Sequence, residues 1–259
     1  MSATFFFGCE TMKLYYLLPL TTFLCQTAFA APTTETAEKD PAFDGSAKLG
    51  FIYSKTTNTS MSLNSATDLN YKKNNWSNKL SLSSFYTDST EEEDGVNKYQ
   101  IALKNEYTMG PHSFTYLSNT YNHDQFGTYR SEYIVSTGLG YKFYDTKTTK
   151  LVVGGGPGYR HSRRQADDPD YPNQTEQNMI ANAFLRAKKQ FTPTFSAGFE
   201  SNVDYGRSNT AYNLEAFIKN RLIDHIALML DTQYIYNTEV ASDKSNDEVY
   251  STVSITYDF

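Results

Sequence analysis

The residues that could carry acid–base chemistry in this sequence are few, and most of them fall in connecting segments. The four histidines are His112, His123, His161 and His225. His123 precedes Asp124, and a carboxylate beside a histidine can orient the imidazole as a general base. The sequence has no Gly-x-Ser-x-Gly nucleophile elbow and no cluster with metal-ligand spacing. We therefore predict a non-enzyme without catalytic residues, metal or cofactor, and keep an enzyme acting through His123 as an alternative.

Charged residues of both signs recur at alternate positions along most of the chain. In KYQIALKNEY (residues 98–107), Lys98, Lys104 and Glu106 alternate with aliphatic and aromatic residues. Side chains two positions apart share one face of a strand, so the charged and apolar groups are expected on opposite faces. The charged residues that we predict to line a polar interior are Lys79, Lys98, Lys104, Arg130, Glu132, Lys142, Glu200, Asp204, Glu215, Lys219 and Asp231.

Twelve segments of this alternating kind follow one another from residue 44 to residue 259. Their connections alternate between tight ones, such as Lys73-Asn74-Asn75, and longer charged ones, such as residues 88–96. A strand of about 9–11 residues tilted near 45° spans a membrane, and short turns alternating with long loops are typical of membrane barrels. The pattern predicts an all-β fold, an antiparallel transmembrane β-barrel of about twelve strands with both termini in the periplasm. A secreted β-sandwich is the alternative.

Composition narrows the classes of protein further. The chain carries a formal net charge of −6, so there is no basic excess of the kind that binds nucleic acid. Aromatic residues make up 15% of the chain, with 21 tyrosines, and many of them stand near the ends of the alternating segments. Such rings are typical of the two interfaces of a membrane barrel. No stretch after the N-terminal segment is long and apolar enough for a membrane-spanning helix.

The N-terminal segment has the features of a secretory signal. Lys13 precedes an apolar run, and Ala28 and Ala30 stand at the small-residue positions of a cleavage site, with Ala31 following. We predict a cleaved signal peptide over residues 1–30, with translation starting at either Met1 or Met12. Residues 31–43 are then a flexible periplasmic lead-in and residues 44–259 the barrel. The two cysteines precede residue 31, which leaves no thiol in the mature chain.

A basic cluster follows the glycine-rich stretch GGGPG (residues 154–158). The stretch lacks the Lys-Ser/Thr ending of a phosphate-binding loop, so we interpret its glycines as relief of crowding between strands. Guanidinium groups match the geometry of phosphate. We therefore predict that Arg160, Arg163 and Arg164 contact the phosphates of lipopolysaccharide at the outer rim, the alternative being a solvated loop face.

The chain ends in VSITYDF, where Val253, Ile255, Tyr257 and Phe259 alternate with polar residues. A barrel must pair its last strand with its first, because open strand edges cannot stand in hydrocarbon. An amphipathic last strand with a terminal phenylalanine also resembles the signal read by the bacterial barrel-assembly machinery. We predict that these four residues serve as that signal during insertion.

One longer stretch resembles a known family. The segment STGLGYKFYDTKTTKLVVGGGPGYRHS (residues 136–162), preceded by NHDQFGTYRS (residues 122–131), is similar to the salt-induced outer membrane proteins, a family with a domain of unknown function. The shared features are a Gly-x-Gly-Tyr strand, a tight turn with Asp, and a strand ending Gly-x-Gly-Tyr-Arg. The resemblance implies an outer-membrane barrel, and it brings no catalytic residues.

Together these observations predict a non-enzymatic protein of the bacterial outer membrane, either an envelope component or a narrow channel. A selective porin for small ions or anionic solutes and an enzyme at the outer rim remain the alternatives. The expected partners are outer-membrane lipid, lipopolysaccharide and the assembly machinery. Mixed charges inside a barrel of this size can either pair into a plug or line a polar path, and the sequence leaves both open.

Overall fold

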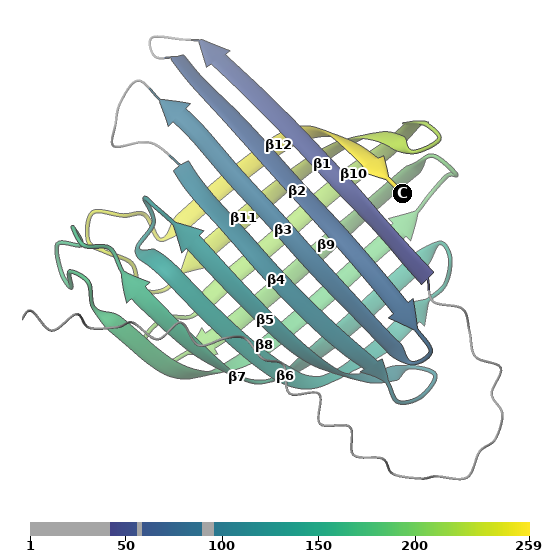
Figure 1. Ribbon diagram of the computed structural model, residues 1–259, viewed down its shortest axis with the longest axis horizontal. Coiled ribbons are helices and arrows are strands. Elements are labelled where there is room, and N and C mark those ends of the chain that lie inside the picture. The colour runs from purple at the N-terminus through teal and green to yellow at the C-terminus, as the bar shows by residue number, and fades with distance from the viewer. Residues whose placement is uncertain (1–41, 56–58, 90–95) are drawn as a thin grey trace, which may run out of the picture. The chain divides into compact units, whose positions relative to one another are not determined.

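The computed structural model describes residues 42–55, 59–89 and 96–259, and these form twelve β-strands (Figure 1). The predicted signal peptide, with Ala28, Ala30 and Ala31, lies outside the described residues. The first strand begins at Ala42, within the last two residues of the predicted lead-in. The strands are Ala42–Lys55 (β1), Thr59–Lys73 (β2), Trp76–Ser89 (β3), Val96–Thr108 (β4), Ser113–Asp124 (β5), Tyr129–Asp145 (β6), Thr149–Arg164 (β7), Thr175–Gln190 (β8), Phe195–Gly206 (β9), Ala211–Ile223 (β10), Ile226–Asn237 (β11) and Asp247–Asp258 (β12).

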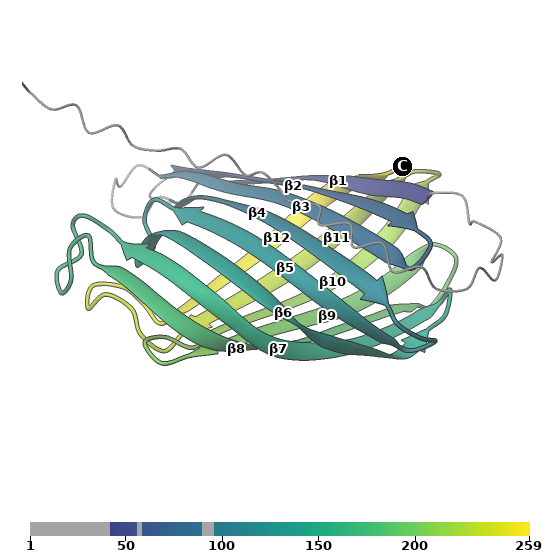
Figure 2. The same cartoon turned by 60° about the horizontal axis from the view of Figure 1, so that its bottom comes forward.

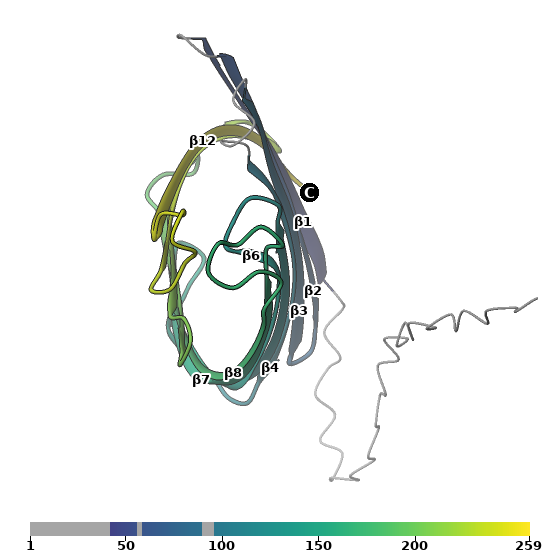
Figure 3. The same ribbon diagram turned by 90° about the vertical axis from the view of Figure 1, so that its left-hand side faces the viewer.

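The strands form a closed antiparallel barrel. Each strand pairs with its neighbours in sequence, and β1 pairs with β12 to close the ring, which Figure 3 shows end-on. This confirms the predicted fold class and strand number. The closing seam is short, since β1 pairs with β12 only over residues 46–50, whereas β1 pairs with β2 along its whole length.

The C-terminal residue extends the closing seam by one further pair. The backbone N–H of Phe259 donates to the carbonyl of Gly45, and the N–H of Gly45 donates back, both at 2.9 Å. A Cβ atom on Gly45 would lie 2.6 Å from the Phe259 ring, so only glycine leaves room for this ring. Val253, Ile255, Tyr257 and Phe259 all lie on the exposed outer face.

The barrel has two different ends. Tight turns join β2 to β3, β4 to β5, β6 to β7, β8 to β9 and β10 to β11, and the C-terminus lies at the same end (Figure 2). We call this the short-turn end. The opposite end, the loop end, carries the longer connections 165–174 and 238–246 together with 125–128 and 207–210. The predicted alternation of tight and long connections is therefore present only in part among the described residues, because 125–128 and 207–210 are no longer than the short-turn connections 109–112 and 191–194.

The outer face of the barrel is apolar. Leu49 is 59% exposed, Leu139 63% and Ile255 59%, and they are surrounded by other exposed aliphatic residues. Aromatic side chains are paired near both ends of the strands, as Trp76 with Tyr107 (ring centroids 4.9 Å apart) toward the short-turn end. An apolar surface of this extent, closed into a ring, is stable only where lipid covers it. No helix among the described residues is long and apolar enough to span a membrane.

The glycines of β6 and β7 let aromatic rings enter the wall of the barrel. The ring of Phe114, which is fully buried, covers Gly140, and the ring of Phe184 covers Gly154. A Cβ at either glycine would overlap the ring. The predicted relief of crowding therefore takes a definite form at these two glycines, each of which receives an inward-facing aromatic ring from a neighbouring strand, whereas a Cβ at Gly138 or Gly156 would meet the backbone of the adjacent strand.

Candidate functional site in the barrel lumen

The lumen is crossed by side chains at two levels. At the first, Arg186 of β8 donates through Nη2 to Glu106 Oε1 of β4 at 2.8 Å. The strands β5, β6 and β7 separate β4 from β8 around the ring, so this ion pair spans the interior. Lys104 lies beside it, with its Nζ 3.7 Å from Glu106 and 3.6 Å above the ring of Phe184. We call these four residues the first crossing.

The second crossing joins β3 and β4 to β12. Lys98 Nζ lies 3.4 Å from Glu248 and 3.7 Å above the ring of Tyr250. The ring of Phe85 meets the ring of Tyr250 edge-on, with centroids 5.0 Å apart, and the Tyr250 hydroxyl donates to Glu248. Three strands lie between β4 and β12 around the ring, so these contacts also span the lumen. Strand β4 is thus linked across the interior to β8 and to β12.

Most of the remaining residues predicted to line the lumen are paired along the wall. Lys219 donates to Asp258 at 2.7 Å, and Asp231 accepts from Lys48 at 3.2 Å. The other wall pairs and their shortest distances are Lys79 with Asp68 (3.3 Å), Lys142 with Asp145 (3.6 Å) and Glu132 with Arg160 (3.4 Å). Opposite charges held at this spacing neutralise each other, so the described lumen has a small net field along most of its wall.

Three acidic residues and one basic residue remain among the residues that were predicted to line the lumen. Glu200 lies directly opposite Glu215 in the pairing of β9 with β10, and opposite Arg186 in the pairing with β8. Asp204 is buried and accepts from Asn182 Nδ2 at 2.6 Å. Arg130 is exposed and lies at a register shift near the start of β6, away from both crossings. Alternation alone could not place Arg130, because the irregular register interrupts the two-residue period there.

The aromatic residues of the two crossings were not among the predicted lumen residues. Phe85, Phe184 and Tyr250 point inward although rings of this kind were expected at the lipid interfaces. Their positions carry a signal, because each has the parity of the charged residues in its own strand. The residue type predicted that these rings contact lipid, whereas their position in the strand predicted that they face the lumen. The position gave the correct prediction.

The basic cluster of β7 does not fit its predicted contact with lipopolysaccharide. Arg160 is 2% exposed and donates to the carbonyls of Asn209 (2.9 Å) and Asp204 (3.3 Å). Arg164 is likewise buried, and its guanidinium is occupied by carboxylates. Only Arg163 lies on the exposed face. Alternation explains the difference, because Arg160 and Arg164 share the inward parity and Arg163 the outward one.

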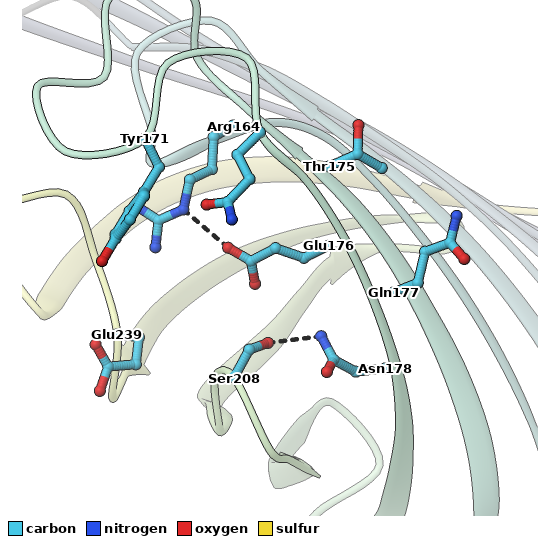
Figure 4. A pocket seen from close by; sticks show the side chains of 9 residues that line it. Arg164, Tyr171, Thr175, Glu176, Gln177, Asn178, Ser208 and Glu239 are labelled. Atoms are coloured by element: carbon cyan, nitrogen blue, oxygen red, sulfur yellow. Dashed lines mark hydrogen bonds and ion pairs between the residues drawn. The ribbon is translucent and has the colours of Figure 1, made fainter.

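Arg164 ties the loop 165–174 to the barrel. It donates to Asp168 and to Glu176, each at 2.9 Å. Figure 4 shows the contact with Glu176, which lies beside a polar pocket at the loop end. Asp168 also accepts from the backbone N–H groups of Asp170 (2.9 Å) and Tyr171 (2.8 Å). Burial alone would raise the pKa of the Asp168 carboxyl, but the hydrogen bonds from Tyr171, Arg164 and Asp170 together hold that pKa below its ordinary value.

The loops of this end are also bound to one another. Gln165 donates to the carbonyls of Asp124 (2.8 Å) and Gln125 (2.9 Å), which links loop 165–174 to the end of β5 and the segment 125–128. The N–H of Ser242 donates to Asp170 at 2.8 Å, which links it to loop 238–246. Several hydrogen bonds therefore connect these loops to one another and to the barrel, and such a network restricts the conformations of the loops.

The His123–Asp124 pair does not form a catalytic arrangement. His123 stacks on Tyr99 at 4.9 Å between ring centroids. Asp124 accepts from the backbone N–H groups of Phe126 and Gly127 instead. Neighbouring residues of a strand point to opposite faces, which separates the two groups. Among the described residues no group of three His, Cys, Asp or Glu could hold a metal ion.

An apolar outer face, a polar interior and a closed ring of strands define a membrane-spanning β-barrel. The chain belongs to the family described as "Protein of unknown function, DUF481", which it matches over residues 47–259. No curated protein sequence matches it.

Solved structures share the fold at low sequence identity. The COG4313 outer membrane channel from Pseudomonas putida F1 is 10% identical, with a TM-score of 0.52 over 89% of this chain and 100% of that one. The NanC porin is 11% identical, with a TM-score of 0.45 over 84% of this chain and 98% of that one. A KdgM porin, solved in complex with disordered oligogalacturonate, is 10% identical, with a TM-score of 0.44 over 83% and 99%.

Proposed function

We propose that this protein is a narrow channel for small ions and hydrophilic solutes in the bacterial outer membrane, without enzymatic activity. The observation that carries the proposal is the charge and the water exposure of the side chains that line the lumen. Charged side chains line it and most of them are paired, yet they remain reachable by water, as the 39% and 38% exposures of the Lys79 and Asp68 side chains indicate. Two crossings narrow this path without filling it with apolar side chains.

Location in the outer membrane is part of the same proposal. It is supported by the lipid-covered apolar face, by the signal-like N-terminal segment and by the family resemblance. In this arrangement the termini and the short turns face the periplasm. The assembly machinery recognises the last strand through Val253, Ile255, Tyr257 and Phe259. Arg163 remains the one residue of the basic cluster placed to meet lipopolysaccharide phosphate. The family resemblance also suggests a role under salt stress.

The test is single-channel recording of the refolded protein in a planar bilayer. We expect discrete steps well below those of porins with about 16–18 strands, whose lumen is a wide aqueous channel. The folded state is verified first by the change in electrophoretic mobility on heating. A folded, heat-modifiable barrel that never conducts would refute the channel, and would leave a non-conducting envelope component as the function.

A further inference from the structure

The interior of the short-turn end carries a cluster of lysines. Lys150 of β7 and Lys188 of β8 are direct cross-strand partners. Both have the inward parity of their strands, since Val152 and Arg186 are two residues away on the same faces. Lys142 lies on β6, which pairs with β7, and Lys219 lies on β10, which β9 separates from β8; we call these four residues the lysine mouth.

Two lysines of the mouth have no acidic partner. Lys142 is paired with Asp145 and Lys219 with Asp258. Lys150 and Lys188 make no ion pair within 4.0 Å with any acidic group in the part of the chain that the structure describes. Like charges directly opposite each other destabilise a sheet, so this arrangement has a cost that a bound anion would remove.

The charge of the interior also changes sign along the barrel. Toward the loop end the inward carboxylates exceed the cations by one, with Glu132, Glu176, Asp204 and Glu248 against Lys98, Arg160 and Arg164. Toward the short-turn end, the lysine mouth leads to Arg186 and Lys104 of the first crossing. An anion that enters at the short-turn end therefore meets Lys150 and Lys188 before it reaches the first crossing, while Asp145 and Asp258 offset the charges of the other two lysines.

We propose that the lysine mouth captures small anions with two or more negative charges, of the phosphate or polycarboxylate kind, at the short-turn end of the lumen. The inference rests on the proposed channel function and deepens it by naming the solute class. Capture at a shared pair of ammonium groups favours a multivalent anion over chloride, because one solute then interacts with both charges.

The test compares two double variants in the full barrel. Lys150→Gln with Lys188→Gln removes the unpaired charges of the mouth. Lys147→Gln with Lys189→Gln removes the same charge nearby, from the β6–β7 turn and from the outward side chain that lies 5.4 Å from the Phe191 ring. Heat-modifiability shows that each variant is folded. Inorganic pyrophosphate is the probe, with equilibrium dialysis against the detergent-solubilised barrel and block of single-channel current as the readouts.

We expect pyrophosphate to bind the wild-type barrel and to block its current. The Lys150/Lys188 variant should bind about tenfold more weakly, and the Lys147/Lys189 variant should match the wild type to within about twofold. Equal loss in both variants, or no loss in the first, would overturn the lysine mouth. A barrel that is electrically silent but still binds pyrophosphate through Lys150 and Lys188 would refute the channel and uphold the anion site.

Discussion

The ion pair of the first crossing predicts two substitutions with opposite effects on ion selectivity. Lys104, Glu106 and Arg186 together have a formal net charge of +1. Glu106→Gln raises that charge by one and Arg186→Gln lowers it by one. We therefore expect Glu106→Gln to raise the permeability of chloride relative to potassium, and Arg186→Gln to lower it. The double variant restores the original charge and should return close to the wild-type ratio.

The magnitude follows from the geometry of the crossing. A permeating ion about 4 Å from a unit charge in water gains or loses about 1 kcal/mol. Each substitution shifts the energies of chloride and potassium in opposite directions, so the unscreened permeability ratio changes by about 2 kcal/mol, or about thirtyfold. Screening reduces the effect at high salt, because the Debye length is about 10 Å at 0.1 M and about 3 Å at 1 M.

The assay is the reversal potential across a planar bilayer under a KCl gradient. Lys189→Gln serves as a control, because it removes one positive charge from an outward-facing position. If Glu106→Gln and Arg186→Gln shift the ratio in the same direction, or neither shifts it, the first crossing does not lie on the conduction path.

The same pair can be tested through stability. At an effective dielectric constant of about 20, unit charges about 4 Å apart attract by about 4 kcal/mol before the loss of hydration is counted. The side chains of Arg186 and Glu106 are 30% and 18% exposed, so part of that attraction is screened. A double-mutant cycle in urea should give a coupling energy of about 1–2 kcal/mol. A coupling near zero would mean that the ion pair does not hold β4 to β8.

Three further predictions concern the frame around the lumen. Arg160→Met leaves the half-buried Glu132 without its cation and the carbonyls of Asn209 and Asp204 without their donor, and should cost about 3 kcal/mol in urea unfolding, whereas Arg163→Ala should change the unfolding free energy by less than about 0.5 kcal/mol. Gly45→Val places side-chain atoms against the Phe259 ring at the seam, so the heat-modifiable band should weaken on electrophoresis, while an unchanged band would contradict the seam packing. Because the pKa of Asp168 is lowered in the folded loop, its carboxylate stabilises the loop at pH values above the ordinary carboxyl pKa of about 3.9, and this stabilisation is lost as the pH falls through the lowered pKa. Pepsin should therefore cut residues 165–174 only in that acidic range. Equal cutting at pH 5 would contradict this prediction.

The sequence alone predicted the wall of the barrel well, because alternation has a direct physical meaning in a strand. A period of two assigned Leu49 and Ile255 to the outer face and Lys104 to the lumen without knowledge of the neighbouring strands. The period of two could not place Arg130, where the register shifts. At Arg160 and Arg164 the period indicated the lumen, but their residue type was given more weight. Their parity pointed inward, but a basic cluster at the end of a strand was interpreted as a contact with lipid.

The sequence by itself determined the class of fold, the number of strands and most of the charged residues that face inward, since these depend on local periodicity and on the turns that separate the strands. The tertiary structure alone decided which inward residues meet. Arg186 and Glu106 are eighty residues apart, and their contact depends on how far β4 and β8 approach across the closed ring. That approach is set by strand register and by glycines that receive aromatic rings. Closure brings distant strands together, and a period of two carries no information about distance across a lumen.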